Sequence, residues 1–173
     1  MDKHTVIVII ASIAIVIPFV YSGWNIYAVN QLQIHDTSED GFRFFDMISE
    51  GKILICNPSP FFVNFNKLNI ITYFDSNNKG KFSSNPINIS PISSVIINGT
   101  FSSESFPEAQ YLALHFDGIF SGAAPERIDP RKLMIVTEFE TPILGIIPYT
   151  VTKQYSGLYF WETMNGDIGE FNC

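Results

Sequence analysis

Basic residues are scarce in this chain of 173 residues, which has 10 Lys and Arg against 17 Asp and Glu and a formal charge of −7. Nucleic-acid binding needs a clustered basic surface, so this balance argues against nucleic acid as a partner. Charged residues make up 16 % of the chain and apolar residues 46 %, a low charge content for a soluble protein. Two cysteines are too few for a disulfide-rich scaffold or a four-cysteine zinc site.

Patterns typical of catalytic and metal sites are also lacking. The sequence contains no glycine-rich phosphate loop and no nucleophile elbow. The three histidines have no metal-ligand spacing; they are His4, His35 and His115. An acidic cluster lacks the spacing of a calcium loop and is interpreted as a solvated face; it consists of Asp36, Glu39 and Asp40. We therefore expect no metal, no cofactor and no catalytic residues, and we predict that the protein is not an enzyme.

The chain begins with a long apolar run. Between Thr5 and Tyr21 it reads TVIVIIASIAIVIPFVY, without a charge, and weaker apolar character continues to Val29. About 20 helical residues cross the hydrocarbon core of a bilayer, and Pro18 is tolerated in a membrane helix. The sequence therefore predicts a transmembrane anchor over residues 5–29, with the lipid bilayer as its partner.

The flanks of this run predict its orientation. Lys3 precedes the run, and no basic residue follows until Arg43. By the positive-inside rule, residues 1–4 form a cytoplasmic end and the remainder lies outside. The alternative is a signal peptide cleaved near Val20-Tyr21-Ser22. Both interpretations place residues 30–173 outside the cytoplasm.

The rest of the chain predicts a mainly β domain. Residues 30–41 are polar and acidic and are expected to form a stalk. Residues 42–173 alternate short apolar runs with turn residues, a pattern typical of an antiparallel β-sandwich of fibronectin-III or immunoglobulin type. The expected strands are Phe42–Ile48, Lys52–Cys56, Phe61–Phe74, Ile87–Ile89, Ser94–Phe101, Lys132–Glu140, Ile143–Gln154 and Tyr159–Thr163.

Local signals mark the breaks between these strands. Residues 49–51 (Ser-Glu-Gly) predict a hairpin turn, and residues 75–80 (DSNNKG) predict a polar loop. Asn98-Gly99 indicates either a hairpin turn or a bulge. Residues 105–116 predict one short helix, because Pro107 suits a first turn and an apolar stripe follows at helical spacing. A strand is the competing interpretation of that segment, since its apolar residues also alternate.

The segment from Lys52 to Phe74 reads KILICNPSPFFVNFNKLNIITYF. A hydrophobic strand, an Asn57-Pro58 turn and a long alternating strand resemble the type-2 late-embryogenesis-abundant family, which includes the water-stress-and-hypersensitive-response domain. The resemblance covers roughly residues 42–163. It implies a small β-sandwich with one short helix, membrane-anchored forms and a link to stress tolerance, and it transfers no catalytic residue.

Several residues are candidate sites. Asn57 and Pro58 are interpreted as a structural turn that ends a strand, the alternative being contact with a ligand. Cys56 and Cys173 predict either a disulfide or a buried Cys56 with a free terminal thiol. Asn98 begins an Asn-Gly-Thr acceptor for N-glycosylation, and Asn88 begins a weaker one that precedes a proline.

The function expected from these observations is a non-catalytic binding or stress-protective module held at a membrane surface. The alternative is an accessory or structural subunit of a larger membrane complex, with the span packed against other helices through a small-residue patch at Ala11, Ser12 and Ala14. An external hydrolase is a third, weaker hypothesis, because no site for it is visible.

Overall fold

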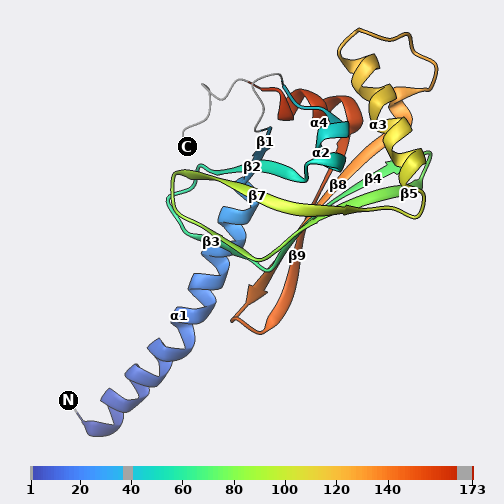
Figure 1. Ribbon diagram of the computed structural model, residues 1–173. Coiled ribbons are helices and arrows are strands. Elements are labelled where there is room, and N and C mark those ends of the chain that lie inside the picture. The colour runs from blue at the N-terminus through green and yellow to red at the C-terminus, as the bar shows by residue number, and fades with distance from the viewer. Residues whose placement is uncertain (1, 37–40, 167–172) are drawn as a thin grey trace.

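The computed structural model describes residues 2–36, 41–166 and 173. A long N-terminal helix projects from a mainly antiparallel β domain (Figure 1), which confirms the predicted fold class. One curled sheet has seven strands in the order β1-β2-β7-β5-β4-β8-β9, and β3 pairs with β6 in a second sheet. The strands are β1 Gln33–His35, β2 Lys52–Asn57, β3 Val63–Phe65, β4 Lys67–Phe74, β5 Asn77–Ser84, β6 Ile87–Ile89, β7 Ser93–Ser102, β8 Leu133–Ile143 and β9 Ile147–Ser156.

The small sheet packs against the large one. The ring of Phe65 in β3 meets that of Phe139 in β8 edge to face, with ring centroids 5.4 Å apart. Val63, Phe65 and Ile89 are all buried. Alternation along β8 explains the two faces of the main sheet, since Leu133, Ile135 and Phe139 are buried in the core while Glu138 and Glu140 are half-buried. The apolar core therefore lies between the two sheets and under the helices.

The structure has more helices than the single short one predicted for the domain. Helix α1 spans Lys3–Gln31, and α2 (Phe44–Ser49), α3 (Phe106–Phe120) and α4 (Gly157–Met164) belong to the β domain. A short 3-10 turn, η1, covers Pro130–Lys132. The predicted helix at residues 105–116 is present as α3, and its stripe of Ala109, Leu112, Ala113 and Phe116 is the buried face.

Two predicted strands are wrong. Phe42–Ile48 contains helix α2, in which Phe44 and Met47 are buried at a spacing of three residues. Tyr159–Thr163 lies within α4, where the buried residues Gly157, Phe160 and Met164 also follow helical spacing. The side-chain hydroxyl of Ser156 caps α4 by accepting a hydrogen bond from the backbone N–H of Tyr159 at 3.3 Å. Short apolar runs are ambiguous between strand and helix, and here the packing against α3 and the sheet selects the helix.

Other boundaries also differ from the expectation. The turn at residues 49–51 joins α2 to β2 and is not a hairpin, and the predicted strand Phe61–Phe74 is divided into β3 and β4. Residues 75–80 are mostly strand, because a tight turn at Asp75 and Ser76, both with positive φ, leads directly into β5. Asn98-Gly99 lies inside β7 and not at its end.

The expected stalk is only partly separate from the domain. Residues 33–35 form strand β1, which pairs with β2, and Ile34 and His35 are buried. The acidic residues Glu39 and Asp40 lie outside the described part of the chain. Helix α1 is thus followed almost immediately by a strand of the sheet, so residues 33–35 belong to the β domain.

Candidate functional site

The last third of helix α1 is built into the β domain. Ser22, Asn25, Ala28 and Val29 are buried, whereas the preceding apolar side chains are exposed. Helix α1 is long and apolar enough to cross a membrane. One helix therefore combines a segment of membrane-spanning character with a segment that belongs to the domain core.

A buried amide forms the centre of this junction. The side-chain amide of Asn25 donates to the backbone carbonyl of Asn64 at 2.9 Å and to the hydroxyl of Thr141. Its side-chain oxygen accepts from the backbone N–H of Asn64 at 2.8 Å. The Thr141 hydroxyl in turn donates to the Asn64 carbonyl at 2.9 Å. Satisfied buried polar networks specify one arrangement of the elements that they join, so this network fixes α1 against β3 and β8.

Two further contacts extend the junction. The Ser22 hydroxyl donates to the carbonyl of Pro18 at 2.9 Å and accepts from the backbone N–H of Leu144 at 2.9 Å, which ties α1 to the β8–β9 turn. At the other end of α1, the ammonium group of Lys153 donates to the carbonyls of Asn30 and Leu32 at 2.8 and 3.2 Å. Burial lowers the pKa of Lys153.

A groove lies where the two ends of the curled sheet approach each other. It has a volume of about 460 Å³. Residues 30–34, where α1 leads into β1, line one side of the groove, strand β9 lines the other, and α4 lies beside it. Lys153 contributes the positive charge, and the stacked rings of Tyr155 and Tyr159, 6.0 Å apart, form an aromatic wall. Burial raises the pKa of Tyr155. Hollows of about 360 to 440 Å³ lie elsewhere on the surface, so it is the lysine beside two stacked tyrosines, and not the volume, that makes this groove a candidate binding surface.

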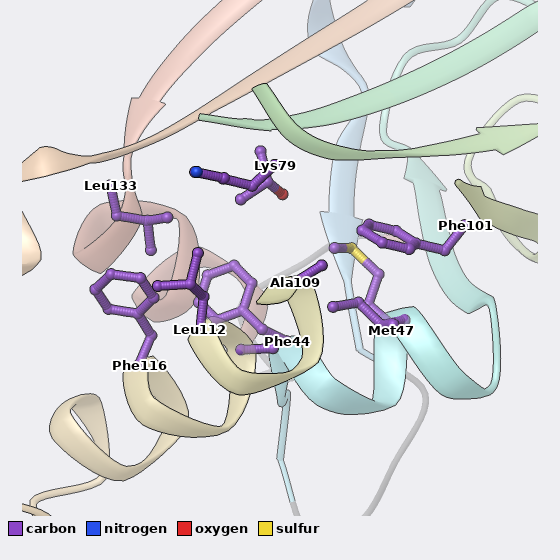
Figure 2. Close-up of a pocket in the computed structure, with 11 residues that line it drawn as sticks. Phe44, Met47, Lys79, Phe101, Ala109, Leu112, Phe116 and Leu133 are labelled. Atoms are coloured by element: carbon purple, nitrogen blue, oxygen red, sulfur yellow. The ribbon is translucent and has the colours of Figure 1, made fainter. Parts of the chain in front are cut away.

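A second cavity, beneath α3, is apolar and much smaller than the groove (Figure 2). Phe44 and Met47 of α2 and Leu112 and Phe116 of α3 point into the space in front of Leu133. The cavity volume is about 20 Å³, which is enough for about one water molecule. Lys79 reaches its edge, and its ammonium group pairs with Glu108 at 2.7 Å. This cavity is a small packing gap between the helices and the sheet, too small for a ligand.

A half-buried carboxylate links α3 to α2 next to this cavity. The two side-chain oxygens of Asp117 accept hydrogen bonds from the backbone N–H groups of Phe44 and Phe45 at 2.8 and 3.0 Å, at the N-terminus of α2. Burial, the largest cause, raises the pKa of Asp117 to about 6. The nearby charge of Asp46 also raises the pKa, whereas the two backbone N–H donors and Arg43 lower it. Desolvation of the charged form is therefore the dominant influence on this group.

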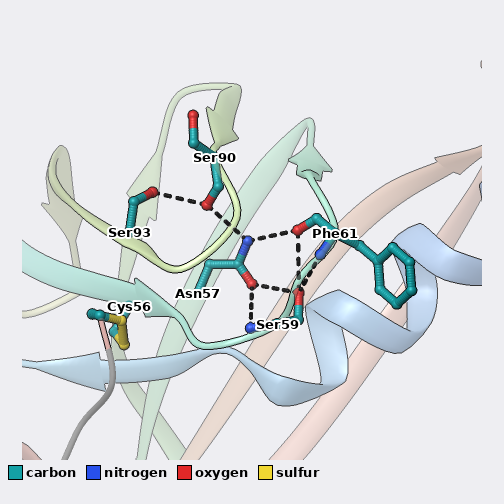
Figure 3. Close-up of a disulfide and its surroundings, with 7 residues drawn as sticks. Cys56, Asn57, Ser59, Phe61, Ser90 and Ser93 are labelled. Atoms are coloured by element: carbon teal, nitrogen blue, oxygen red, sulfur yellow. Dashed lines mark hydrogen bonds between the residues drawn. A yellow bond between two sulfur atoms is a disulfide. The ribbon is translucent and has the colours of Figure 1, made fainter.

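Asn57 is the last residue of β2, and Pro58 begins the loop that follows (Figure 3). The side-chain amide of Asn57, fully buried, donates to the carbonyls of Phe61 and Ser90 at 2.8 and 3.0 Å. Its oxygen accepts from the backbone N–H and the hydroxyl of Ser59 at 3.1 and 2.7 Å. All four contacts are within the domain, and they join the loop after β2 to the loop between β6 and β7.

The structure joins Cys56 and Cys173 in a disulfide. Their Cα atoms are 5.9 Å apart, and 117 residues separate them in the chain. Cys56 is buried in β2, directly before Asn57, so the bond ties the last residue of the chain to the strand that ends in the Asn57 turn. The structure contains no free thiol among its two cysteines.

The remaining predicted positions lie apart from one another. Asn98 and Asn88, the candidate glycosylation residues, are exposed on β7 and β6. His35 is buried, which lowers its pKa, and His115 stacks on Tyr111 at 5.8 Å between ring centroids. Within residues 2–36, 41–166 and 173, no three His, Cys, Asp or Glu side chains gather as metal ligands.

Sequence analysis missed the junction and the groove. Asn25 lies 39 residues from Asn64 and 116 residues from Thr141 in the sequence, and no local pattern links positions so far apart. One signal was present: Asn25 is a polar residue inside an otherwise apolar helical stretch, and such residues usually face a protein partner and not lipid.

Comparison with known proteins adds little to this description. No protein-family model matches the chain, and no curated protein matches it. Among solved structures, the chain is similar to the crystal structure of a protein from Archaeoglobus fulgidus, with 9 % sequence identity and a TM-score of 0.27. The match covers 73 % of this chain and 94 % of that one.

Proposed function

We propose that this chain is a single-span membrane protein whose β domain acts outside the cytoplasm as a non-catalytic binding module. The observation that carries the proposal is the junction between α1 and the domain. A helix of membrane-spanning character continues without interruption into the core, where Asn25 is 3 % exposed and hydrogen-bonded to both β3 and β8 partners. Such a connection holds the domain directly on the bilayer surface.

The same junction supports a retained anchor over a cleaved signal peptide. Cleavage near Ser22 would cut α1 at the point where its residues begin to pack on the domain. It would also remove Pro18, whose carbonyl accepts from the Ser22 hydroxyl, and place a new charged amino terminus beside the hydrogen bond between Ser22 and Leu144. The short cytoplasmic end at residues 1–4 and the outside location of the domain follow from the positive-inside rule.

The groove beside Lys153 supports a binding role. It combines a lysine, two tyrosines and apolar side chains in a concave surface, whereas the apolar cavity beneath α3 is too small for a ligand. We place ligand or client binding at the groove. A protective role in water stress is the form of this function that the resemblance to the type-2 late-embryogenesis-abundant family implies.

Photo-crosslinking of the full-length protein in its native membrane tests the binding role. A photoreactive phenylalanine analogue replaces Tyr159 in the groove or, as the matched control, Tyr111 on α3; both tyrosines are well exposed. We expect an adduct of defined mass from position 159 and none from position 111. Equal crosslinking at both positions, or none at either, would contradict binding at the groove.

The accessory-subunit alternative makes a different prediction. In that case α1 packs against other helices, and its small residues Ala11, Ser12 and Ala14 provide the close approach. Native mass spectrometry after mild detergent extraction would then show partners in fixed stoichiometry. A lone species that protects a freeze-sensitive test enzyme during freezing and thawing would support the stress-protective module instead.

A further inference from the structure

The turn between β8 and β9 exposes an unusual amount of apolar surface. Ile146 is 84 % exposed, and Ile147 and Tyr149 are also exposed. Residues 141–152 (TPILGIIPYTVT) contain no charged side chain. Exposed apolar clusters of this kind mark interaction surfaces in soluble domains, so the composition of this hairpin requires an apolar partner.

The position of the turn along α1 identifies that partner. Leu144 donates its backbone N–H to Ser22, which is bonded one helical turn back to Pro18. At 1.5 Å per residue, the part of α1 that precedes Ser22 is about 28 Å long, close to the roughly 30 Å of a bilayer's hydrocarbon core. The hairpin extends alongside α1 toward its N-terminal end (Figure 1). A bilayer crossed by α1 therefore ends at about the level of the hairpin tip.

The conformation of the turn points in the same direction. Leu144 and Gly145 both have positive φ, at 55° and 73°. Asn, Asp and Gly are the residues favoured at positions of positive φ, and leucine is a poor choice there on conformational grounds. Pro142 and Pro148 face each other across the hairpin, and neither has an N–H group that would need a partner away from water. The tip of the hairpin is therefore apolar although a leucine at a positive φ has a conformational cost.

Aromatic side chains continue this apolar surface around the helix. Trp24 and Tyr27 are exposed on α1. Phe61 stacks on Trp24 with ring centroids 5.2 Å apart, and Phe62 beside it is exposed. Tryptophan and tyrosine are enriched at the boundary between lipid and water. These four aromatic residues therefore lie at the level where the proposed membrane span would meet the outer lipid–water boundary.

We propose that the tip of the β8–β9 hairpin, through Leu144, Ile146, Ile147 and Tyr149, is a second lipid contact that lies in the interfacial layer of the outer leaflet. The proposal rests on the membrane span proposed above. Insertion is shallow, because the backbone of a turn cannot satisfy all its polar groups in the hydrocarbon core. Two lipid contacts, one from α1 and one from the hairpin, fix both the tilt and the rotation of the domain on the membrane.

Depth-dependent fluorescence quenching of the full-length protein in phosphatidylcholine and phosphatidylglycerol vesicles tests this proposal. A single environment-sensitive label is attached at Ile146→Cys, at Ile13→Cys within α1, or at Leu114→Cys on α3. Leu114 is a matched control because it is apolar and exposed and belongs to α3, which lies at the far end of the fold from the N-terminus of α1 (Figure 1). The unsubstituted protein provides the labelling blank for Cys56 and Cys173.

We expect lipid spin labels near the headgroups to quench position 146 at least twofold more than position 114, and deep spin labels to quench position 13. Quenching at position 13 without quenching at position 146 would support the membrane span of α1 but contradict the lipid contact of the hairpin. A blue-shifted label at position 146 that lipid spin labels do not quench would place a second copy or another protein on the hairpin and would also overturn it. Absence of quenching at position 13 would overturn the span itself.

A second variant separates lipid contact from folding. Leu144→Asn places a turn-favouring residue at a positive φ and removes one apolar side chain from the tip. We expect its melting temperature to be unchanged or higher, while quenching of the label at position 146 falls at least twofold. Unchanged quenching in this variant would contradict the role of these side chains as the lipid contact.

Discussion

Asn25 in helix α1 is hydrogen-bonded through its side-chain amide to the hydroxyl of Thr141 in strand β8, and both side chains are buried. The two residues belong to the segments that the sequence assigns to different compartments, the membrane anchor and the outer domain. Their contact shows that helix α1 and the domain share one core. The stability of the domain therefore depends on residues of α1.

Replacement of Asn25 by alanine should destabilise the domain by about 2–3 kcal/mol, because it leaves the buried Asn64 N–H and the Thr141 hydroxyl without their amide partner. The measurement is denaturant unfolding in mild detergent, followed by tryptophan fluorescence. Asn30→Ala is the matched control, since Asn30 is exposed and its side chain bonds only within the helix. Equal effects of the two substitutions would contradict a structural role for the junction.

Replacement of Asn57 should also be costly. Asn57→Ala removes four hydrogen bonds from a fully buried position, and we expect a loss of about 2–3 kcal/mol. Asn57→Asp should be worse, because it loses both amide donors and buries a carboxylate beside two carbonyl oxygens. Exposed Asn77, with one bond to the carbonyl of Asp75, is the control and should change stability by less than about 0.5 kcal/mol.

Loss of the disulfide should be the largest single effect. Cys173→Ser opens a loop closed by residues 117 apart, and the chain-entropy estimate for a loop of this size is up to about 5 kcal/mol. Cys173 is exposed, so this substitution isolates the cross-link from packing effects. Unfolding midpoints with and without reductant check the prediction: reductant should lower the midpoint of the natural chain and leave that of the variant unchanged.

Asp117 should make stability depend on pH in the direction opposite to a salt-bridged carboxylate. Its pKa is about 6 in the folded protein and 3.8 as the reference value, so the folded state keeps its proton to higher pH than the unfolded state. Stability therefore falls as pH rises between those values, and the cost of the charge is complete above the folded pKa. Between pH 5 and pH 7 the loss attributable to this group is about 1 kcal/mol.

Asp117→Asn provides the test. The amide keeps the size of the carboxylate and can still accept from the N-terminus of α2, but it does not titrate over this range. The difference in unfolding free energy between the natural protein and the variant should change by about 1 kcal/mol from pH 5 to pH 7. A constant difference over that range would show that Asp117 retains an ordinary pKa.

The sequence predicted the fold where its patterns were long or well marked. The apolar run that became α1 and the stripe from Ala109 to Phe116 in α3 needed no tertiary information. Strand β5 was missed because NNKGKFSS has little apolar alternation; its polar residues follow a turn, and pairing with β4 and β7 makes it a strand. Helices α2 and α4 were taken for strands because the apolar residues of such short segments, six and eight residues long, fit both periods.

The site was harder to predict than the fold. Asn57 and Pro58 were interpreted as a turn from a local segment, but the Asn57 side chain also bonds to Ser90, which comes from another loop. The groove near Lys153 exists only because the curled sheet brings β9 close to the chain around Leu32. Curvature of a sheet depends on all its strands together, and no short motif encodes it.

Synthesis of the full-length chain in the presence of sealed microsomes, followed by carbonate washing and mass measurement, tests the membrane account most directly. The account predicts that the uncleaved chain stays in the membrane pellet and carries a glycan at Asn98 that Asn98→Gln removes. Release of the chain by carbonate, or an unglycosylated chain whose carboxyl half is digested by protease added outside the microsomes, would contradict it.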